Sequence, residues 1–352
     1  MAPQRRIVVV DSDGVQVIMG PEPQPASGEV QLALVRGGVC GSDLHAAAGR
    51  HPFVSLPYHP GHELVATITA LGDGVGDWQV GDRVVVEPPL SCVALRVVEP
   101  GFPAEDCKPC RTGRPNLCER LRFFGCAYEQ GGFAERSTIP ANRLHHVPDD
   151  LTDDQAALIE PLSTPVHAAE LAGPLLGRTV VIIGAGTIGL LQLVAARHAG
   201  ATRIVVSDPL PAKRAIAERL GADAVVDGRA DDMVAQVRGL LGESADVVFD
   251  CVAVESTVRQ AIGLAGKGGT VVVVGVPTGD VVVPLHLVQD QQIRIQGSAT
   301  YVPTDYDTAI EILRSGAVPT EVFVTGHRPL AQAADAFALA AGGDHVKVLL
   351  TP

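Results

Sequence analysis

The sequence predicts an α/β protein in which a β-rich, barrel-like domain precedes a doubly wound parallel sheet. Two observations carry this prediction. The first ~155 residues contain short strands separated by frequent Gly and Pro turns. From about residue 178, buried strands alternate with helical stretches. The length of 352 residues agrees with two domains of roughly 150 residues or more each.

In the β-rich part, apolar and polar residues alternate at 30–35 (VQLALV), and glycine turns follow at 71–74 (LGDG) and 80–82 (VGD). After residue 297, helices are expected near 305–315 and 331–341, and a last strand at 347–350 is expected to return to the first domain. The predicted domains are therefore 1–158 with 298–352, and 159–297.

In the second domain, strands and helices alternate at the spacing of βαβ units. Valine-rich runs such as 180–183 (VVII) and 271–274 (VVVV) are typical of strands that are buried on both faces. The expected strands are 179–183, 203–207, 224–226, 246–249 and 270–274, and the expected helices are 187–198, 211–220, 231–241 and 255–265.

A glycine-rich turn follows the first of these strands, with the pattern G-x-G-x-x-G at 184–189 (GAGTIG). Between a strand and a helix, this pattern is the fingerprint of a dinucleotide site. Gly184 makes the tight turn, Gly186 lets the backbone approach a pyrophosphate, and Gly189 lets helix and strand pack closely. The amides of the first helical turn, at Thr187 and Ile188, face the phosphates.

An acidic residue at the end of the second strand bears on cofactor choice. Asp208 lies 19 residues after Gly189, where a carboxylate accepts hydrogen bonds from a ribose diol and repels a 2′-phosphate. Lys213 and Arg214 follow one helical turn later and are the groups that would bind such a phosphate. Because the carboxylate is closer to the ribose, the sequence favours NAD over NADP.

Charge and composition exclude several classes of partner. The net charge of −13 disfavours nucleic acid, because an acidic surface repels a phosphate backbone. No apolar stretch reaches the ~18 residues of a membrane span, and the start of the chain (MAPQRR) resembles no signal peptide. A cytoplasmic protein is expected. Three of the seven cysteines crowd into residues 107–118, which indicates metal binding.

Three separate segments carry residues that bind catalytic zinc in proteins. They are 40–45 (CGSDLH), 61–63 (GHE) and 159–163 (IEPLS). A thiolate, an imidazole and a carboxylate can close around Zn²⁺ and leave one position open for a substrate. A metal in such a site lowers the pKa of a bound water from about 15.7 to about 7, and the same argument applies to an alcohol.

These segments together resemble the zinc-containing medium-chain dehydrogenases, most closely the sorbitol, threonine and glucose dehydrogenase branch, over nearly the whole chain. The resemblance implies a GroES-like catalytic domain, a Rossmann domain, and oxidation of a secondary alcohol to a ketone by NAD. It implies that Cys40 and His62 bind zinc. It also implies that Glu63 and Glu160 supply the remaining oxygen contacts, with either of them the direct ligand. Classical alcohol dehydrogenases have a cysteine at the position of Glu160.

The resemblance also implies a proton relay and a residue that orients a metal ligand. Ser42 would take the proton of the alcohol, which then passes by way of the cofactor ribose to His45 and to solvent. Asp43 would orient His62. The other histidines singled out have no spacing argument behind them and are expected to be structural: His51, His59, His145, His146 and His167.

The second cysteine cluster resembles the structural zinc lobe of the same family, which is a closed site of four thiolates. Cys107, Cys110 and Cys118 fit, but Ala104 occupies the usual first position. Cys92 is the predicted fourth ligand, with 93–106 as an inserted loop. Cys126 as the fourth ligand, a metal-free lobe and a disulfide remain as alternatives. Cys251, at the end of a strand, is predicted to have a packing role.

The substrate is the least determined feature. In sorbitol dehydrogenases an Arg and a Tyr contact the polyol. Tyr301 matches the Tyr, whereas Thr300 stands at the position of the Arg. The expected activity is therefore that of an alcohol, polyol, sugar or cyclitol dehydrogenase with two zinc ions per chain. The alternatives are a zinc enzyme for another alcohol and a non-enzymatic NAD-binding protein.

The resemblance to the polyol branch implies a homo-oligomer, a tetramer or else a dimer. The valine runs at 271–274 and 281–283 agree with this, because either could add strands across a two-fold axis.

Overall fold

The computed structural model describes residues 4–352, and the chain folds as two units. The first unit comprises residues 1–160 and 319–352, and the second comprises residues 161–318. The expectation about the start of the chain falls partly on Met1–Pro3, which lie outside the described residues. Among the described residues, no helix is long and apolar enough to cross a membrane.

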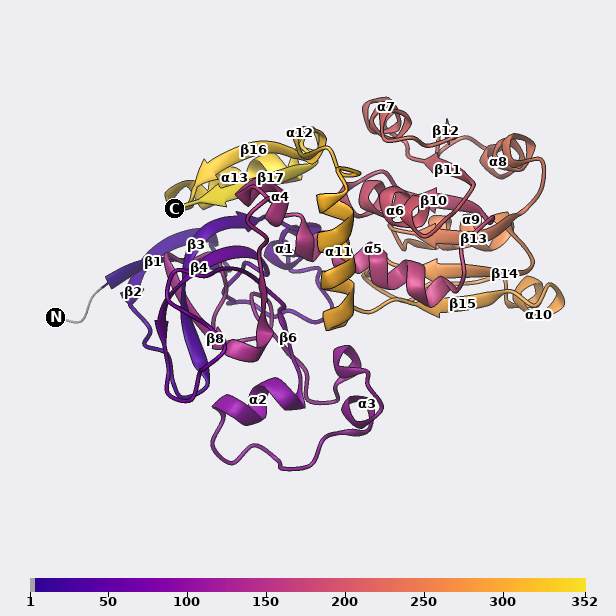
Figure 1. Ribbon diagram of the computed structural model, residues 1–352. Helices are drawn as coiled ribbons and strands as arrows, with labels where there is room; N and C mark the ends of the chain where they lie inside the picture. Colours follow the sequence, from indigo (N-terminus) through magenta and orange to yellow (C-terminus); the bar gives the residue numbers. More distant parts are fainter. Residues whose placement is uncertain (1–3) are drawn as a thin grey trace. The chain divides into compact units, whose positions relative to one another are not determined.

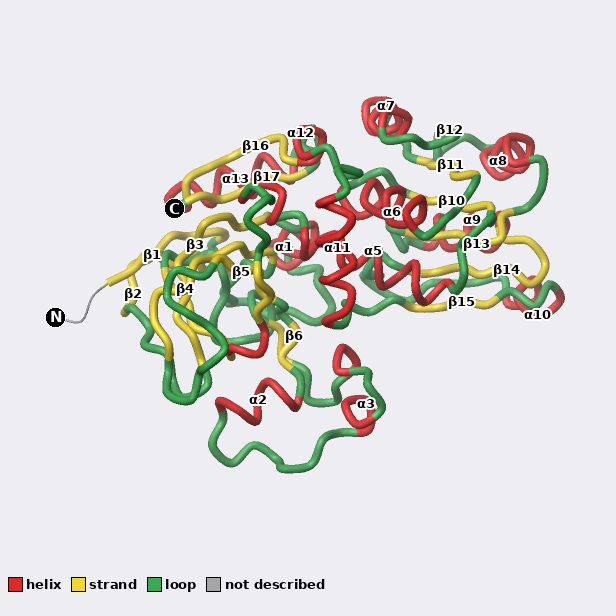
Figure 2. The backbone as a smooth tube through the Cα atoms, viewed as in Figure 1, coloured by secondary structure: helices red, strands yellow, loops and turns green. Residues whose placement is uncertain are grey.

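The first unit is built mainly of antiparallel strands (Figures 1 and 2). Its strands are β1 (Gln4–Asp11), β2 (Gly14–Pro21), β3 (Glu29–Gly38), β4 (Glu63–Leu71), β5 (Arg83–Val86), β6 (Pro89–Leu90), β7 (Arg122–Phe123), β8 (Arg136–Pro140), β9 (Leu144–His146), β16 (Val324–Pro329) and β17 (Lys347–Thr351). Its helices are α1 (Gly41–Ala47), α2 (Cys92–Val98), α3 (Lys108–Arg111), α4 (Asp153–Ala156), α12 (Thr320–Phe323) and α13 (Ala333–Ala341), with short 3₁₀ turns at Pro115–Leu117, Ala141–Arg143 and Leu330–Gln332.

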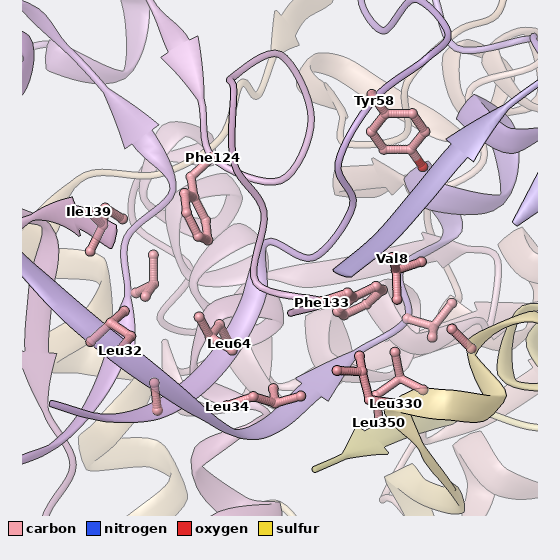
Figure 3. Packing of buried hydrophobic residues seen from close by; sticks show 14 of the residues in the cluster. Val8, Leu32, Leu34, Tyr58, Leu64, Phe124, Phe133, Ile139, Leu330 and Leu350 are labelled. Atoms are coloured by element: carbon pink, nitrogen blue, oxygen red, sulfur yellow. The ribbon is translucent and has the colours of Figure 1, made fainter. Parts of the chain in front are cut away.

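The largest sheet of this unit follows the order β16-β17-β3-β4-β5-β9, and β8 also pairs with β3. The alternation at 30–35 has its expected effect, because Val30, Leu32 and Leu34 of β3 all lie in the buried core. The same core holds Phe133 (Figure 3), whose ring meets Phe337 edge-on at 6.2 Å between centroids. The predicted return of the last strand is confirmed, since β17 pairs with β3.

The second unit holds a six-stranded parallel sheet of order β12-β11-β10-β13-β14-β15. This is the strand order of the dinucleotide-binding doubly wound fold. Its elements are α5 (Ile159–Ala172, which begins in the first unit), β10 (Thr179–Ile183), α6 (Thr187–His198), β11 (Arg203–Ser207), α7 (Pro211–Arg219), β12 (Ala224–Val226), α8 (Met233–Leu241), β13 (Ala245–Asp250), α9 (Glu255–Leu264), β14 (Ala265–Val273), α10 (Leu285–Asp290), β15 (Arg294–Gly297) and α11 (Pro303–Arg314).

The helices of this unit pack in pairs, α6 with α7 and α8 with α9. Strand residues such as Val181 and Val248 share a buried cluster with Val237 of α8 and Ile262 of α9. Strand β10 is buried along its whole length. The valine-rich runs are therefore central strands covered on both faces, as their composition predicts.

Three predictions about organisation need correction. Residues 298–318 belong to the second unit, where Oδ2 of Asp305 in α11 lies 2.9 Å from Nδ1 of His167 in α5. The inserted segment after Cys92 is partly helical, since α2 extends to Val98. The valines at 271–274 lie largely in β14, between β13 and β15, and those at 281–283 are in no strand. The run at 271–274 lies inside the sheet and therefore cannot add strands across a symmetry axis.

Candidate functional site

The dinucleotide fingerprint forms the turn between β10 and α6, and the geometry of the chain requires glycine at two of its three glycine positions. Gly184 has a φ of +95°, which favours glycine. A Cβ at Gly189 would lie 1.8 Å from the carbonyl oxygen of Gly184, so no larger residue fits there. A Cβ at Gly186 would meet no atom within 4 Å. Gly186 is also the N-cap of α6, so Thr187 and Ile188 form its first turn and their amides are the donors for a phosphate.

Asp208 follows β11 directly and is buried beside this turn. Its Oδ2 accepts a hydrogen bond from the Ala185 amide, and its Oδ1 accepts one from the Leu210 amide, both at 2.8 Å. Arg214 donates from Nη1 to the carbonyl oxygens of Asp208 and Pro209 at 2.7 and 3.0 Å. The guanidinium therefore braces the turn after β11, and the carboxylate next to the glycine turn is held in a fixed position.

In the first unit, the metal-binding residue types of two sequence segments come together. Candidate ligand atoms of Cys40, His62 and Glu63 all lie within 4.8 Å of one another. Cys40 is the N-cap of α1, while His62 and Glu63 stand at the start of β4. Gly61, just before them, has a φ of +106°, and a Cβ there would lie 2.4 Å from the Phe133 backbone nitrogen. Glycine is needed at that position for the strand to begin where it does.

Asp43 is buried beside this cluster. Its Oδ2 accepts a hydrogen bond from the Cys40 amide at 3.0 Å, and its Oδ1 lies 3.7 Å from Nδ1 of His62. Burial raises the pKa of Asp43 to about 6, and the opposing effect of His62 is smaller. The buried carboxylate therefore hydrogen-bonds the Cys40 segment and lies close to His62.

Glu63 is held by a partner that the sequence did not reveal. Nζ of Lys347, in β17, donates to both of its oxygens at 2.6 and 2.7 Å, and also to the Val39 carbonyl at 3.2 Å. Both side chains are almost fully buried. A Cβ at Gly38 would lie 1.9 Å from Oε2 of Glu63, so glycine leaves the room that this carboxylate occupies.

Burial acts to lower the pKa of Lys347, but the negative groups around it outweigh this effect and raise the pKa above its ordinary value. These groups include Glu63, Cys40 and Glu160. Glu160 is buried in the first turn of α5 and contributes to the negative potential of the cluster. Among the described residues, the set within 4.8 Å comprises Cys40, His62 and Glu63 and does not extend to Glu160.

Cys126 also lies at this site, although the sequence suggested it only as an alternative fourth ligand of the second cysteine cluster. Its Sγ lies 3.7 Å from Nδ1 of His62, so it is no member of the second cysteine cluster. Burial acts to lower the pKa of His62, yet Cys126, Asp43 and Cys40 raise it well above its ordinary value. The cluster contains a thiol, an imidazole and carboxylates, which are the ligand types of catalytic zinc. A bound cation would also compensate the negative charge of these groups. The residues present therefore fit zinc.

Ser42 and His45 lie on α1, three residues apart and therefore on one side of the helix. Ser42 is half-buried and His45 is exposed. This order from the interior of the cluster outward suits a proton path to solvent. The pKa of His51 is lowered by its burial and then by the charges of His45 and His62.

Four cysteines meet in the lobe that contains α2 and α3. Candidate ligand atoms of Cys92, Cys107, Cys110 and Cys118 all lie within 4.8 Å of one another. Sγ of Cys118 is 3.5 Å from that of Cys92 and 3.7 Å from that of Cys107. A tetrahedron with Zn–S bonds of about 2.3 Å has edges of roughly 3.8 Å, which matches this spacing. Both Sγ–Sγ distances are far longer than the roughly 2.05 Å of a disulfide bond.

Backbone amides and an arginine surround the sulfurs of this lobe. The amides of Glu119 and Arg120 donate to Cys107 and Cys118 at 3.4 Å each. Nη1 of Arg120 lies 3.5 Å from Sγ of Cys92. Such donors stabilise thiolates and orient metal ligands. The structure thus brings Cys92 to the position that the sequence predicts for the fourth ligand.

We expect purified protein to contain about two zinc ions per chain, one of which resists chelators because its site is closed. Cys92→Ser removes one of its four thiolates and should lower the content to about one, whereas Cys251→Ser, outside both clusters, should leave it unchanged. Elemental analysis of both variants checks this. An unaltered zinc content in Cys92→Ser would contradict the assignment of Cys92.

The chain matches two family models: the alcohol dehydrogenase GroES-like domain over residues 26–149 and the zinc-binding dehydrogenase domain over residues 187–315. It is 33% identical to sorbitol dehydrogenase of Ovis aries over 335 residues, which cover 94% of this chain and 91% of the relative. The protein therefore belongs to the zinc-dependent alcohol dehydrogenase family, whose cofactors are zinc and NAD or NADP. The resemblance drawn from the sequence motifs is confirmed, as is the combination of a GroES-like and a Rossmann domain.

Solved structures agree along the whole chain. A zinc-binding dehydrogenase of Sinorhizobium meliloti, bound to NADP, superimposes with a TM-score of 0.89 at 32% identity, covering 99% of this chain and 100% of that one. An alcohol dehydrogenase of Escherichia coli in complex with NADH also gives a TM-score of 0.89, at 26% identity and with 99% of both chains covered. Because these two structures hold different cofactors, the fold alone leaves the choice between NAD and NADP to the residues of this chain.

Proposed function

We propose that the protein is a zinc- and NAD-dependent dehydrogenase that oxidises a secondary alcohol of the polyol, sugar or cyclitol type to the ketone. The observation that carries this proposal is the convergence of Cys40, His62 and Glu63, with Glu160 as a nearby negative group, in a chain similar to sorbitol dehydrogenase. Zinc bound there would polarise the hydroxyl of the alcohol and favour loss of its proton. The nicotinamide cofactor is the acceptor of the hydride.

The residues of the chain would divide the remaining tasks. Cys40 and His62 hold the metal, and Asp43 fixes their orientation. Ser42 accepts the proton of the alcohol, and His45 delivers it to solvent. Lys347 keeps Glu63 in one position, so the carboxylate that changes contacts during the reaction is proposed to be Glu160.

The loop after β15 contains the residues that bear on the choice of substrate. Tyr301, the proposed substrate contact, packs edge-on against Tyr306 with 5.3 Å between ring centroids. Thr300 precedes it with a φ of +51°, an uncommon conformation for a β-branched residue. Because Thr300 has no cation to offer, we propose a substrate other than sorbitol itself. Following NAD reduction across polyols, sugars, amino alcohols and cyclitols tests this. Absence of turnover on every secondary alcohol, in protein with its full zinc content, would refute the proposed function.

We expect NAD to be strongly preferred over NADP, because the Asp208 carboxylate suits a free ribose diol and repels a 2′-phosphate. Loss of one charged hydrogen bond in Asp208→Ala should reduce the preference by roughly 10–100-fold. The measurement is kcat/KM with each cofactor, with the exposed Asp231→Asn as the control. Equal use of both cofactors by the unaltered protein would show that the interpretation of Asp208 is wrong.

Assembly is proposed to use the edge of the Rossmann sheet. Strand β15 pairs with β14 on one side, and no other described strand pairs with its second side. Ile295 in this strand is 40% exposed, and the neighbouring segment exposes Val282 and Leu285 at 62% and 66%. An unpaired strand edge is a template for a second copy of the chain.

We therefore expect a homo-oligomer, a tetramer or else a dimer, in sedimentation velocity experiments. Ile295→Lys should weaken it, because a lysine on an edge strand opposes pairing. Val80→Lys, at an exposed position in the first unit, is the control. A monomer at micromolar concentration would contradict the proposed assembly.

A further inference from the structure

A cavity of about 540 Å³ lies within the second unit, between α5, α11 and the end of α6. Its walls are mostly apolar, with Ala169, Ala195 and Ile312 among them. The titratable groups that line it are two carboxylates, Glu170 and Asp305, from two different helices, and the exposed imidazole of His198 at the end of α6. The carboxylate of Asp305 is buried, and a buried charge in largely apolar surroundings needs a compensating partner.

The two carboxylates lie close to a histidine of α5. Nδ1 of His167 lies 2.9 Å from Oδ2 of Asp305, and candidate ligand atoms of His167, Glu170 and Asp305 all lie within 4.8 Å of one another. None of these residues belongs to either of the zinc clusters described above. His167 was expected from the sequence to be an ordinary structural histidine, and its partner Asp305 lies 138 residues further along the chain (305 minus 167).

The backbone fixes this arrangement. His167 and Glu170 are three residues apart on α5 and so occupy one face of that helix. Asp305 stands in the first turn of α11, where its carboxylate accepts a hydrogen bond from the Val302 amide at 2.7 Å. His167 and Asp305 are buried, while Glu170 is exposed. The cluster therefore has two buried candidate ligands, His167 and Asp305, and one exposed candidate ligand, Glu170. An ion can enter from the exposed side.

We propose that His167, Glu170 and Asp305 form a third metal site, which takes a divalent first-row transition metal ion and links α5 to α11. One imidazole nitrogen and two carboxylate oxygens suit Mn²⁺, Fe²⁺, Co²⁺ or Zn²⁺. Two carboxylates near one another repel, and their combined charge of about −2 equals that of the ion in magnitude. The cavity beside them leaves space for water to complete the coordination.

A simple ion pair between His167 and Asp305 explains less of the geometry. A protonated His167 compensates Asp305, but it leaves the Glu170 carboxylate as an additional negative charge in the same cluster. The Glu170 carboxylate would then be more favourably placed in solvent, away from Asp305, because Glu170 is exposed on the helix surface. A metal ion holds all three groups at once.

The test uses the full chain with its cysteine-containing sites loaded with zinc. Mn²⁺ is the first probe, because it binds thiolates weakly and does not displace zinc from them. Loss of the free-ion electron paramagnetic resonance signal measures bound Mn²⁺, and equilibrium dialysis against Zn²⁺ measures additional zinc. We expect one further ion per chain with at least one of the two probes.

Glu170→Gln keeps the size of an exposed side chain, so it should fold normally while lowering the affinity for this ion at least 10-fold, as removing a charged ligand does. His167→Gln should abolish binding. Asp307→Asn, an exposed position on α11 outside the cluster, is the matched control and should bind as the unaltered protein does. Failure of both probes to add an ion, or equal binding by Glu170→Gln, would overturn the proposal. Neither outcome bears on the proposed dehydrogenase activity.

Discussion

Replacing Glu160 with alanine should lower turnover by roughly 10–100-fold or more, together with a similar loss of affinity for the catalytic zinc. Glu160 lies at the start of α5, buried, and its charge acts on Lys347 in the metal cluster. Removing it leaves Cys40, His62 and Glu63, which retain zinc more weakly. The measurements are kcat on the best alcohol substrate and zinc retention during dialysis against a chelator.

Two comparisons make this result specific. Glu160→Gln preserves the volume of the side chain but not its charge, so it should also be impaired if the carboxylate is what matters. Glu321→Ala removes an exposed glutamate from the same unit and should retain full activity. NAD affinity should change little in all three variants, because the glycine turn and Asp208 belong to the other unit. Turnover of Glu160→Ala within about twofold of the unaltered protein would show that Glu160 is a structural residue.

Replacing Lys347 with methionine should destabilise the protein by about 3–5 kcal/mol. The ammonium group and the Glu63 carboxylate are both almost fully buried and lie 2.6–2.7 Å apart. Methionine fills similar space but leaves the carboxylate buried without its cation, which is costly in a low-dielectric interior. For a domain of 150–250 residues this corresponds to a fall in Tm of roughly 6–20 °C, which differential scanning calorimetry measures.

A double-mutant cycle separates the ion pair from the shape of the site. Glu63→Gln with Lys347→Met removes both charges, so the double variant should be more stable than Lys347→Met alone. Arg259→Met provides the control, because its partner Glu255 and Arg259 itself are both about half exposed, and such pairs contribute only about 0–1 kcal/mol. Equal losses in Lys347→Met and Arg259→Met would contradict the importance of the buried pair.

The Rossmann unit was largely predictable because its signals are local. The strands 179–183, 203–207 and 224–226 and the helix 187–198 have in the structure the bounds that the sequence predicts. A run of β-branched residues, a glycine turn and an amphipathic helix each depend on neighbours within about a dozen residues. The predicted boundary at residue 297 differs from the end of the second unit at residue 318, because the contacts of this segment are distant in the sequence. Residues 298–318 are joined to their unit by the contact between Asp305 and the distant His167.

The metal cluster was predictable only in part. Cys40, His62 and Glu63 stand in recognisable motifs, and the structure brings them together. Cys126 has no motif, since an isolated cysteine in a loop carries no spacing information. It came to light only because the fold places its sulfur beside His62. Cys92 is an intermediate case. The sequence suggested it as the fourth ligand, because it is a cysteine that precedes the other three. Only the folded lobe brings its sulfur close to theirs.

The sequence by itself determined the two-domain architecture, the dinucleotide turn, the chemical type of the metal ligands and the family. These features depend on short patterns whose physical requirements can be stated residue by residue. The tertiary structure alone decided that Lys347 neutralises Glu63 across 284 residues of chain, that β15 and not the valine run at 271–274 forms the sheet edge, and that His167, Glu170 and Asp305 share one cluster. The physical reason is that a buried charge must find its partner in space, and the chain can supply that partner from any distance along the sequence.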